Sequence, residues 1–184
     1  MELIGPYLIA CALLVGAGVA KAMRPDDTAR ALTVLVPVPQ KWMRRVVRVG
    51  SAAEALLGTV AILFPRAGTA GLVALSYGAF AVVVAVARAR DGAIASCGCF
   101  GTPDTPATSL HVVIDAGLGA ASVAVAASAP AGSIVSILAH QPLHGLPLVA
   151  VSALGAWLVY LALSALAGVQ AARRLTAVSF GPGS

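Results

Sequence analysis

The fold of this chain is decided by residues 46–87, which read VVRVGSAAEALLGTVAILFPRAGTAGLVALSYGAFAVVVAVA. Two apolar runs lie in this stretch, and each approaches the roughly 20 residues that an α-helix needs to cross a bilayer. Pro65 and Arg66 separate them, and a connection this short joins antiparallel neighbours. We therefore expect a hairpin of two membrane-spanning helices, over residues 46–64 and 68–87.

Further apolar runs flank this hairpin, at residues 3–20, 109–127 and 148–169. Hydrophobic residues make up 59% of the 184-residue chain and charged residues only 10%, whereas a soluble domain carries roughly a quarter charged residues. We therefore expect an all-α fold, a polytopic transmembrane helical bundle with a four-helix core and about five spanning helices. We expect a single domain over residues 1–180, with 181–184 a tail or a cloning remnant.

The end of the first apolar run, Val19-Ala20-Lys21-Ala22, loosely suggests a signal-peptidase site. A signal peptide carries positive charge before its apolar part, and no basic residue precedes this run. We therefore expect the run to be the first transmembrane helix.

The least apolar part of the chain runs from Met23 to Arg48 and is rich in basic residues. Pro37 and Pro39 break its short apolar piece, residues 31–36, which we expect at the membrane interface; a shallow re-entrant turn is the alternative. Basic residues gather here, in the loop after the third helix and at the C-terminus, so the positive-inside rule predicts five helices with the N-terminus outside and the C-terminus inside. This distribution explains the formal net charge of +5 without nucleic-acid binding.

The most informative motif is Cys97-Gly98-Cys99-Phe100-Gly101, in the loop predicted between the third and fourth helices. A disulfide between two cysteines one residue apart closes a small, strained ring, and strained disulfides tend to be labile or catalytic. We favour a redox dithiol. Two thiolates can also bind a soft metal ion, and two small residues in a tight turn are the remaining interpretation.

The other cysteine and two of the histidines are assigned to packing and to a loop. Cys11 lies near the middle of the first apolar run, where a lone cysteine is usually a small packing residue; it would become a resolving thiol only if the motif loop re-entered the bundle. His140 and His144 have helical spacing, but Pro142 lies between them. We expect an exposed or interfacial loop there and no metal site.

Two acidic residues, Glu54 and Asp115, fall within apolar runs, where acidic side chains are costly and usually face the bundle interior or a cavity. Helix rise places them about 12 and 9 Å from the same interface. His111 lies four residues before Asp115 and shares its helix face. We expect these three side chains to form one polar pocket beside Cys97 and Cys99, in which a protonated carboxyl supplies the proton that a leaving thiolate needs.

A structural interpretation of these acids stays open beside the functional one. Either acid would then pair with a basic residue such as Arg48 or Arg88 and would only hold helices together. If the functional interpretation holds, the catalytic residues are Cys97, Cys99, Glu54, His111 and Asp115.

The motif, its position after a helical hairpin, the segment Arg48–Glu54 and an Asp in the following helix resemble the MauE branch of the DoxX/MauE membrane proteins. The resemblance covers about Leu3 to Gly168. It implies a multi-pass protein of the bacterial inner membrane and a redox-linked role for Cys97 and Cys99. The family is associated with methylamine utilisation, and the resemblance implies support of disulfide maturation in a periplasmic dehydrogenase, beside a thioredoxin-like partner.

Two function classes follow from these observations. The first is a thiol–disulfide oxidoreductase that passes electrons between a partner's dithiol and a quinone or another thiol pair. The second is a non-catalytic subunit of a larger membrane complex, whose thiols are structural or bind a soft metal. A periplasmic partner requires the thiols outside, whereas the charge bias places them inside. Three explanations of this disagreement stay open: the motif loop re-enters the bundle, the partner is cytoplasmic, or the interpretation of the charge bias is wrong.

Overall fold

The computed structural model describes residues 3–89, 109–128 and 142–179. These residues form helices and no strands: α1 (Ile4–Met23), α2 (Pro25–Leu35), α3 (Gln40–Leu63), α4 (Ala67–Ala89), α5 (Ser109–Ser128) and α7 (Pro142–Ser179). Within the described ranges, 5 helices are long and apolar enough to cross a membrane, and α2 is not among them. The expected all-α transmembrane bundle is confirmed.

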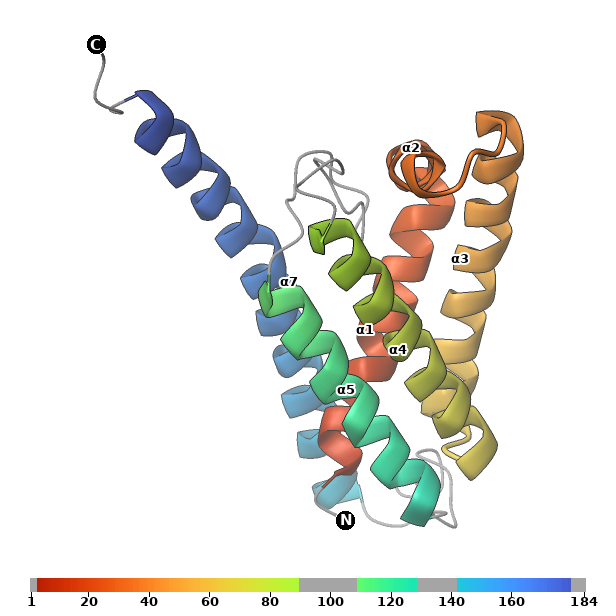
Figure 1. Ribbon diagram of the computed structural model, residues 1–184. Coiled ribbons are helices and arrows are strands. Elements are labelled where there is room, and N and C mark those ends of the chain that lie inside the picture. The colour runs from red at the N-terminus through yellow and green to blue at the C-terminus, as the bar shows by residue number, and fades with distance from the viewer. Residues whose placement is uncertain (1–2, 90–108, 129–141, 180–184) are drawn as a thin grey trace.

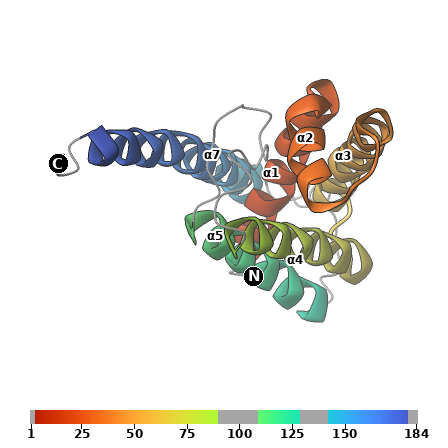
Figure 2. The same cartoon turned by 45° about the horizontal axis from the view of Figure 1, so that its top comes forward.

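The first helix, α1, lies at the centre of the bundle. It packs against α3, α5 and α7, while α4 packs against α5 and α3. Figure 2 shows α4 and α5 side by side, with α3 and α7 on opposite flanks of α1. Helices α1, α4 and α7 run in one direction, and α3 and α5 run in the other (Figure 1). The four-helix core thus consists of α1, α3, α4 and α5, and α7 packs against it through α1.

Prolines set the boundaries of the first helices. Pro25 occupies the first turn of α2, where its missing N–H costs nothing and its fixed φ suits the helix. The residues that precede prolines have extended or irregular backbones: Arg24 (φ −128°, ψ 71°), Val36 (φ −129°, ψ 116°) and Phe64 (φ −132°, ψ 77°). Proline sterically disfavours the α-helical conformation in the residue before it. Each helix therefore ends where the sequence presents a proline.

The turn between α3 and α4 is closed by a side-chain cap. The backbone N–H of Arg66 donates to Thr69 Oγ1 at 3.0 Å, and the Thr69 hydroxyl lies 3.0 Å from the carbonyl oxygen of Phe64. Near a helix start, a side chain three residues further on can accept a hydrogen bond from the backbone N–H of the capping residue. That N–H would otherwise lack a partner. The hairpin predicted over residues 46–87 is present.

Small residues allow α1 and α3 to approach closely. A Cβ on Gly18 would lie 2.6 Å from the carbonyl oxygen of Ser51 and 2.7 Å from the backbone N of Ala55. A Cβ on Gly58 would lie 2.8 Å from the carbonyl oxygen of Cys11. Side chains cannot be added at such distances, so the two backbones pack directly on each other, as small residues permit in membrane helices.

Two helices extend beyond the apolar runs that predicted them. α3 begins at Gln40 rather than near Val46, because Met43 and Val47 pack on Ala29 of α2, although the same turns carry basic residues. α7 begins at Pro142 and contains Pro147, whereas the apolar run that predicted this helix begins only at residue 148. A proline so near a helix start removes a single hydrogen bond to the carbonyl four residues earlier. An apolar run in the sequence therefore predicts the membrane-spanning part of a helix but not where the helix begins or ends.

Candidate functional site

A buried ion pair joins α1 to α3. Lys21 Nζ lies 2.6 Å from Glu54 Oε2, and the two side chains are only 8% and 23% exposed. The same ammonium lies 4.5 Å from the centroid of the Phe80 ring on α4, a cation–π distance. Lys21 lies in the last turn of α1. Three helices therefore converge on one cation near one end of the bundle.

A cavity opens beside this ion pair. Its volume is about 40 Å³, which is enough to hold water. Its walls come from α1, α4, α5 and α7, and they consist of Leu13, Leu14, Ala17, Lys21, Tyr77, Phe80, His111, Ile114, Asp115, Leu118 and Leu163. Most of the wall is apolar, and its polar side chains belong to α1, α4 and α5.

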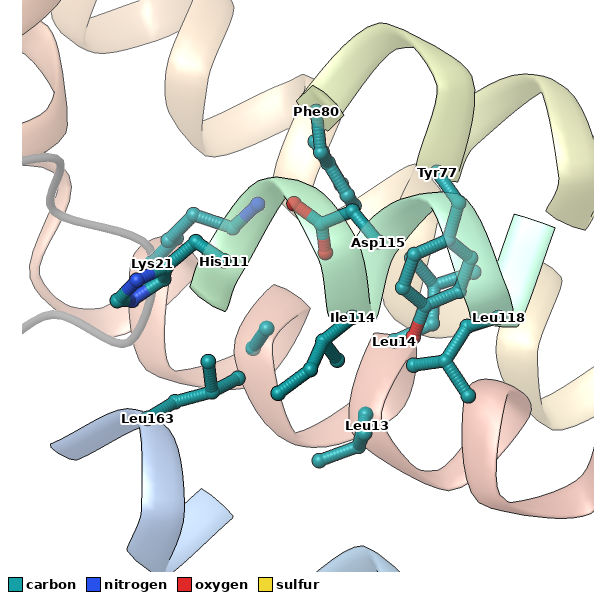
Figure 3. A pocket seen from close by; sticks show the side chains of 11 residues that line it. Leu13, Leu14, Lys21, Tyr77, Phe80, His111, Ile114, Asp115, Leu118 and Leu163 are labelled. Atoms are coloured by element: carbon teal, nitrogen blue, oxygen red, sulfur yellow. The ribbon is translucent and has the colours of Figure 1, made fainter. Parts of the chain in front are cut away.

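The first two turns of α5 supply an imidazole and a carboxylate to the cavity. His111 and Asp115 lie four residues apart, so one helix face carries both, and both line the cavity. His111 is buried, with 4% exposure. In Figure 3 the Asp115 carboxylate and the Lys21 ammonium point toward one another, and the two groups interact electrostatically.

The charges at this end of the cavity are unequal in number. Among the described residues, the ion pairs are Lys21–Glu54, Arg30–Asp27 and Arg44–Asp26, so Asp115 belongs to none of them. Lys21 thus stands between two carboxylates, one bonded directly and one across the cavity. With both ionised, this group carries one excess negative charge, and an uncompensated charge is costly in an apolar environment.

Aromatic side chains of α4 fix another wall of the cavity. The Tyr77 hydroxyl donates to the carbonyl oxygen of Ala10 at 2.8 Å, which ties α4 to α1. The rings of Tyr77 and Phe80 meet edge to face, with centroids 5.9 Å apart and planes at 83°, a favoured arrangement for aromatic pairs. The polar and aromatic walls are therefore both held by contacts between helices.

The cavity brings together two of the three side chains that we expected in one pocket, and Glu54 is not among the residues that line it. His111 and Asp115 line the cavity directly, and Glu54 reaches it through Lys21. Glu54 thus pairs with a basic residue of another helix, as the structural alternative expected, but that residue is Lys21 and not Arg48 or Arg88.

Lys21 is the residue that the sequence interpretation missed, because we read it as the flank of a weak cleavage site. Its spacing contained a usable signal. Lys21 lies seven residues after Leu14 and four after Ala17, so helical periodicity places the three on one face, and all three line the cavity. A lysine in phase with a buried face is a candidate partner for a buried acid.

The two cysteines of the motif, Cys97 and Cys99, lie outside the described residues, as does His140. The ends of the neighbouring helices are described: α4 ends at Ala89 and α5 begins at Ser109, both at the end of the bundle where α1 ends (Figure 1). The chain therefore leaves and re-enters the helices at the end that holds the charged side of the cavity.

Cys11 and His144 are placed differently from the cavity residues. Cys11 is fully buried in the core with Tyr7, Leu14 and Ala61, about 15 Å along α1 from Lys21 by helix rise. His144 falls within the bounds of α7 rather than in the expected loop. Within the described residues, no group of at least three His, Cys, Asp or Glu side chains could hold a metal ion.

Comparison with known proteins identifies one family. The family model described as "Methylamine utilisation protein MauE" matches residues 2–129. The match covers α1 to α5 and the segment that carries Cys97 and Cys99, and it ends before α7. Neither the curated proteins nor the solved structures include a match to this chain.

Proposed function

Because this chain belongs to the MauE family of methylamine utilisation proteins, we propose that it is a membrane thiol–disulfide oxidoreductase. Cys97 and Cys99 would form its redox-active pair. Its partner would be a thioredoxin-like protein, and its role would be to support disulfide formation or maturation in other proteins. The membrane would be the bacterial inner membrane.

One observation carries this proposal more than any other. Asp115 and His111 line a cavity beside the buried Lys21–Glu54 pair, at the end of the bundle where the segment holding both thiols begins and ends. Buried charges in membrane helices are expensive, and they tend to mark functional sites. Thiol exchange also needs groups that give and take protons, and a carboxyl and an imidazole are suited to this.

The proposed step is a two-electron exchange. A thiolate of the partner attacks one sulfur of the Cys97–Cys99 disulfide, and a mixed disulfide forms while the other sulfur leaves as a thiolate. The second partner thiolate then attacks the mixed disulfide. The partner is released oxidised, and Cys97 and Cys99 are left as a dithiol that has gained two electrons and two protons. A membrane quinone is the acceptor class that would reoxidise this dithiol.

The cavity residues have separate roles in this proposal. Asp115, when protonated, supplies a proton to the leaving thiolate, and His111 relays it toward the loop. Lys21 limits the negative charge that accumulates when Asp115 gives up its proton. Glu54 is a positioning residue, because its bond to Lys21 fixes where that ammonium lies.

A redox titration in isolated membranes tests the proposal. The number of alkylated thiols is counted by mass shift across a series of dithiothreitol potentials, in a Cys11→Ala background so that only Cys97 and Cys99 are counted. We expect one two-electron transition. A control with all three cysteines should add one constant thiol after denaturation, because Cys11 is buried.

The partner is identified by trapping. Cys99→Ala and Cys97→Ala should each accumulate a mixed disulfide with a thioredoxin-like protein, and the double variant should not. If Cys97 and Cys99 stay alkylatable under strong oxidant and neither variant traps a partner, the oxidoreductase proposal fails. A non-catalytic subunit of a larger membrane complex would then explain the chain better.

A further inference from the structure

We propose that one face of the first turns of α3 is a binding site for the head group of an anionic phospholipid. The cations of this site are Lys41, Arg45 and Arg48, which we call the basic stripe. The inference goes beyond the proposed function and is independent of it, because neither the cavity nor the two thiols take part.

Burial separates the faces of this part of α3. From residue 40 to residue 50, only Met43 and Val47 are buried, and they pack on Ala29 of α2. The members of the basic stripe are spaced by four and three residues, so they share one helix face. That face is turned away from Met43 and Val47, and all three cations are exposed.

A second exposed stripe runs beside the basic one. Trp42, Val46 and Val49 are 50%, 62% and 69% exposed, and we call them the apolar stripe. Each of them directly follows a member of the basic stripe in the sequence, so a rotation of about 100° separates each cation from its apolar neighbour. The helix thus presents cations and apolar side chains side by side over about three turns. A phospholipid presents the matching combination, a phosphate joined to acyl chains.

The acids of the same region do not neutralise the basic stripe. Asp26 pairs with Arg44, and Asp27 pairs with Arg30. Among the described residues, the basic stripe belongs to none of the ion pairs. Its uncompensated positive charge favours an anionic ligand over a zwitterionic one.

One contact within the site orients a cation toward a phosphate. The guanidinium carbon of Arg45 lies 5.2 Å from the centroid of the Trp42 ring, a cation–π distance. The planar guanidinium group can bond two phosphate oxygens at once, and tryptophan is enriched where a membrane meets water. The contact therefore holds a phosphate-binding group beside an interfacial ring.

The two stripes lie near the membrane surface. α3 has 24 residues and is therefore about 36 Å long, somewhat more than the roughly 30 Å of a hydrocarbon core. In Figure 1 the view runs along α2 but shows α1 and α3 from the side, so α2 lies across this end of the bundle. Long basic side chains near a helix end reach the head groups. A nucleic acid or an acidic protein would leave the apolar stripe uncovered, which favours a lipid.

Quenching by brominated phospholipids tests the site, because the chain contains two tryptophans. Trp42 lies in the site, and Trp157 is exposed on α7. The full-length protein is reconstituted in phosphatidylcholine vesicles that contain a rising share of brominated phosphatidylglycerol or of brominated phosphatidylcholine. At Trp42, in a Trp157→Phe background, we expect a preference for phosphatidylglycerol of at least about fivefold. At Trp157, in a Trp42→Phe background, we expect no preference.

Two double variants separate the stripe from the general charge of the region. Lys41→Gln/Arg48→Gln should reduce the preference at Trp42 to less than about twofold; Arg45 stays in place because it contacts the fluorescent ring. Arg30→Gln/Arg44→Gln is the matched control. It changes the net charge equally, but both arginines are paired with aspartates, so the preference should persist. Thermal unfolding midpoints show that each variant is folded.

A measurement on the site without charge variants covers the case in which the variants do not fold. Salt at 1 M screens charges beyond about 3 Å, against about 10 Å at 0.1 M, so it should reduce the preference at Trp42. The proposal is overturned if the two tryptophans show the same preference, if both double variants lower it equally, or if salt leaves it unchanged. Lack of quenching at Trp42 by either lipid would also overturn it, because the face would then meet water, as a surface for an acidic protein does.

Discussion

Two ion pairs tie α3 to the helices before it, and their surroundings differ. Lys21 of α1 pairs with Glu54, and the side chains are 8% and 23% exposed. Asp26 of α2 pairs with Arg44, and the side chains are 48% and 51% exposed. Each pair joins a basic side chain to an acidic one, but the first pair lies among membrane helices and the second at their end.

The surroundings of each pair determine how much stability is lost when one partner is removed. At the exposed pair, water solvates either charge when its partner is removed, so little is lost. At the buried pair, removal of one partner leaves a charge with neither solvent nor counterion. A protein with this buried pair is therefore little more stable than one with two apolar residues in its place. Removal of only one member of the pair, however, should cost much stability. The buried pair also keeps an ammonium at the edge of the cavity.

The largest expected effect is at Lys21. Lys21→Met removes the only cation bonded to Glu54 among the described residues and leaves the carboxylate buried, which should reduce the free energy of unfolding by about 3–5 kcal/mol. Equilibrium unfolding in mixed micelles measures the loss.

The double variant sharpens this prediction. Lys21→Met with Glu54→Met removes both charges and should recover most of the lost stability, because an apolar pair of similar size can replace a buried ion pair. If the single variant loses less than about 1 kcal/mol, comparable to an exposed pair, the contrast between the two regions is wrong.

A smaller loss is expected where α1 and α3 touch. Gly18 lies three residues before Lys21, and its Cβ would meet the backbone of Ser51 and Ala55. Gly18→Ala should push the helices apart and cost about 1–3 kcal/mol, as overpacking does. The measurement is the same unfolding titration, with Gly16→Ala as the control.

The control variant should behave in the opposite way. Nothing lies within 4 Å of a Cβ on Gly16, so alanine there should be neutral or stabilise the helix by up to about 1 kcal/mol. Equal losses in both variants would mean that the close contact between α1 and α3 is not what brings Lys21 to Glu54.

The sequence predicted one member of the buried pair and not the other, for a physical reason. An acid inside an apolar run is conspicuous because of its cost, and this argument found Glu54 and Asp115. Lys21 lies near the end of its run, where lysines are common because their long side chains reach the interface. Its helical phase with Leu14 and Ala17 indicates an inward side chain, but only the position of Glu54 in space identifies its partner, and single-sequence patterns do not supply that position.

Helix ends were harder to predict than helices. The five apolar spans were all foreseen, because length and hydropathy determine them. The extension of α3 to Gln40 depends on the packing of Met43 and Val47 on α2, which is a tertiary contact. The continuation of α7 to Ser179, through basic residues expected beyond the helix, has no signature in hydropathy.

The loss of a neutral hydrogen bond should reduce the free energy of unfolding by an amount between the losses expected at the two ion pairs. Tyr77→Phe removes the 2.8 Å bond from the hydroxyl to Ala10 and leaves a buried carbonyl, for an expected loss of about 1 kcal/mol. Tyr7→Phe removes a longer contact, 3.5 Å to Ala61, and should cost less. A larger loss for Tyr7→Phe in mixed-micelle unfolding would contradict the ranking by bond length.

The smallest effect is expected at Arg44, and its dependence on salt is the informative part. Arg44→Gln breaks the pair with Asp26 and should cost less than about 1 kcal/mol. Ions screen exposed charges within about 10 Å at 0.1 M salt and within about 3 Å at 1 M, so this loss should shrink as salt is added to the unfolding titration. The loss in Lys21→Met should change little, because ions do not reach a buried pair. Arg48→Gln is the matched control, since Arg48 is exposed on the same helix and belongs to none of the ion pairs among the described residues. If high salt reduced both losses in equal proportion, the two pairs would share one environment, and Lys21 would no longer qualify as the buried cation that positions the polar end of the cavity.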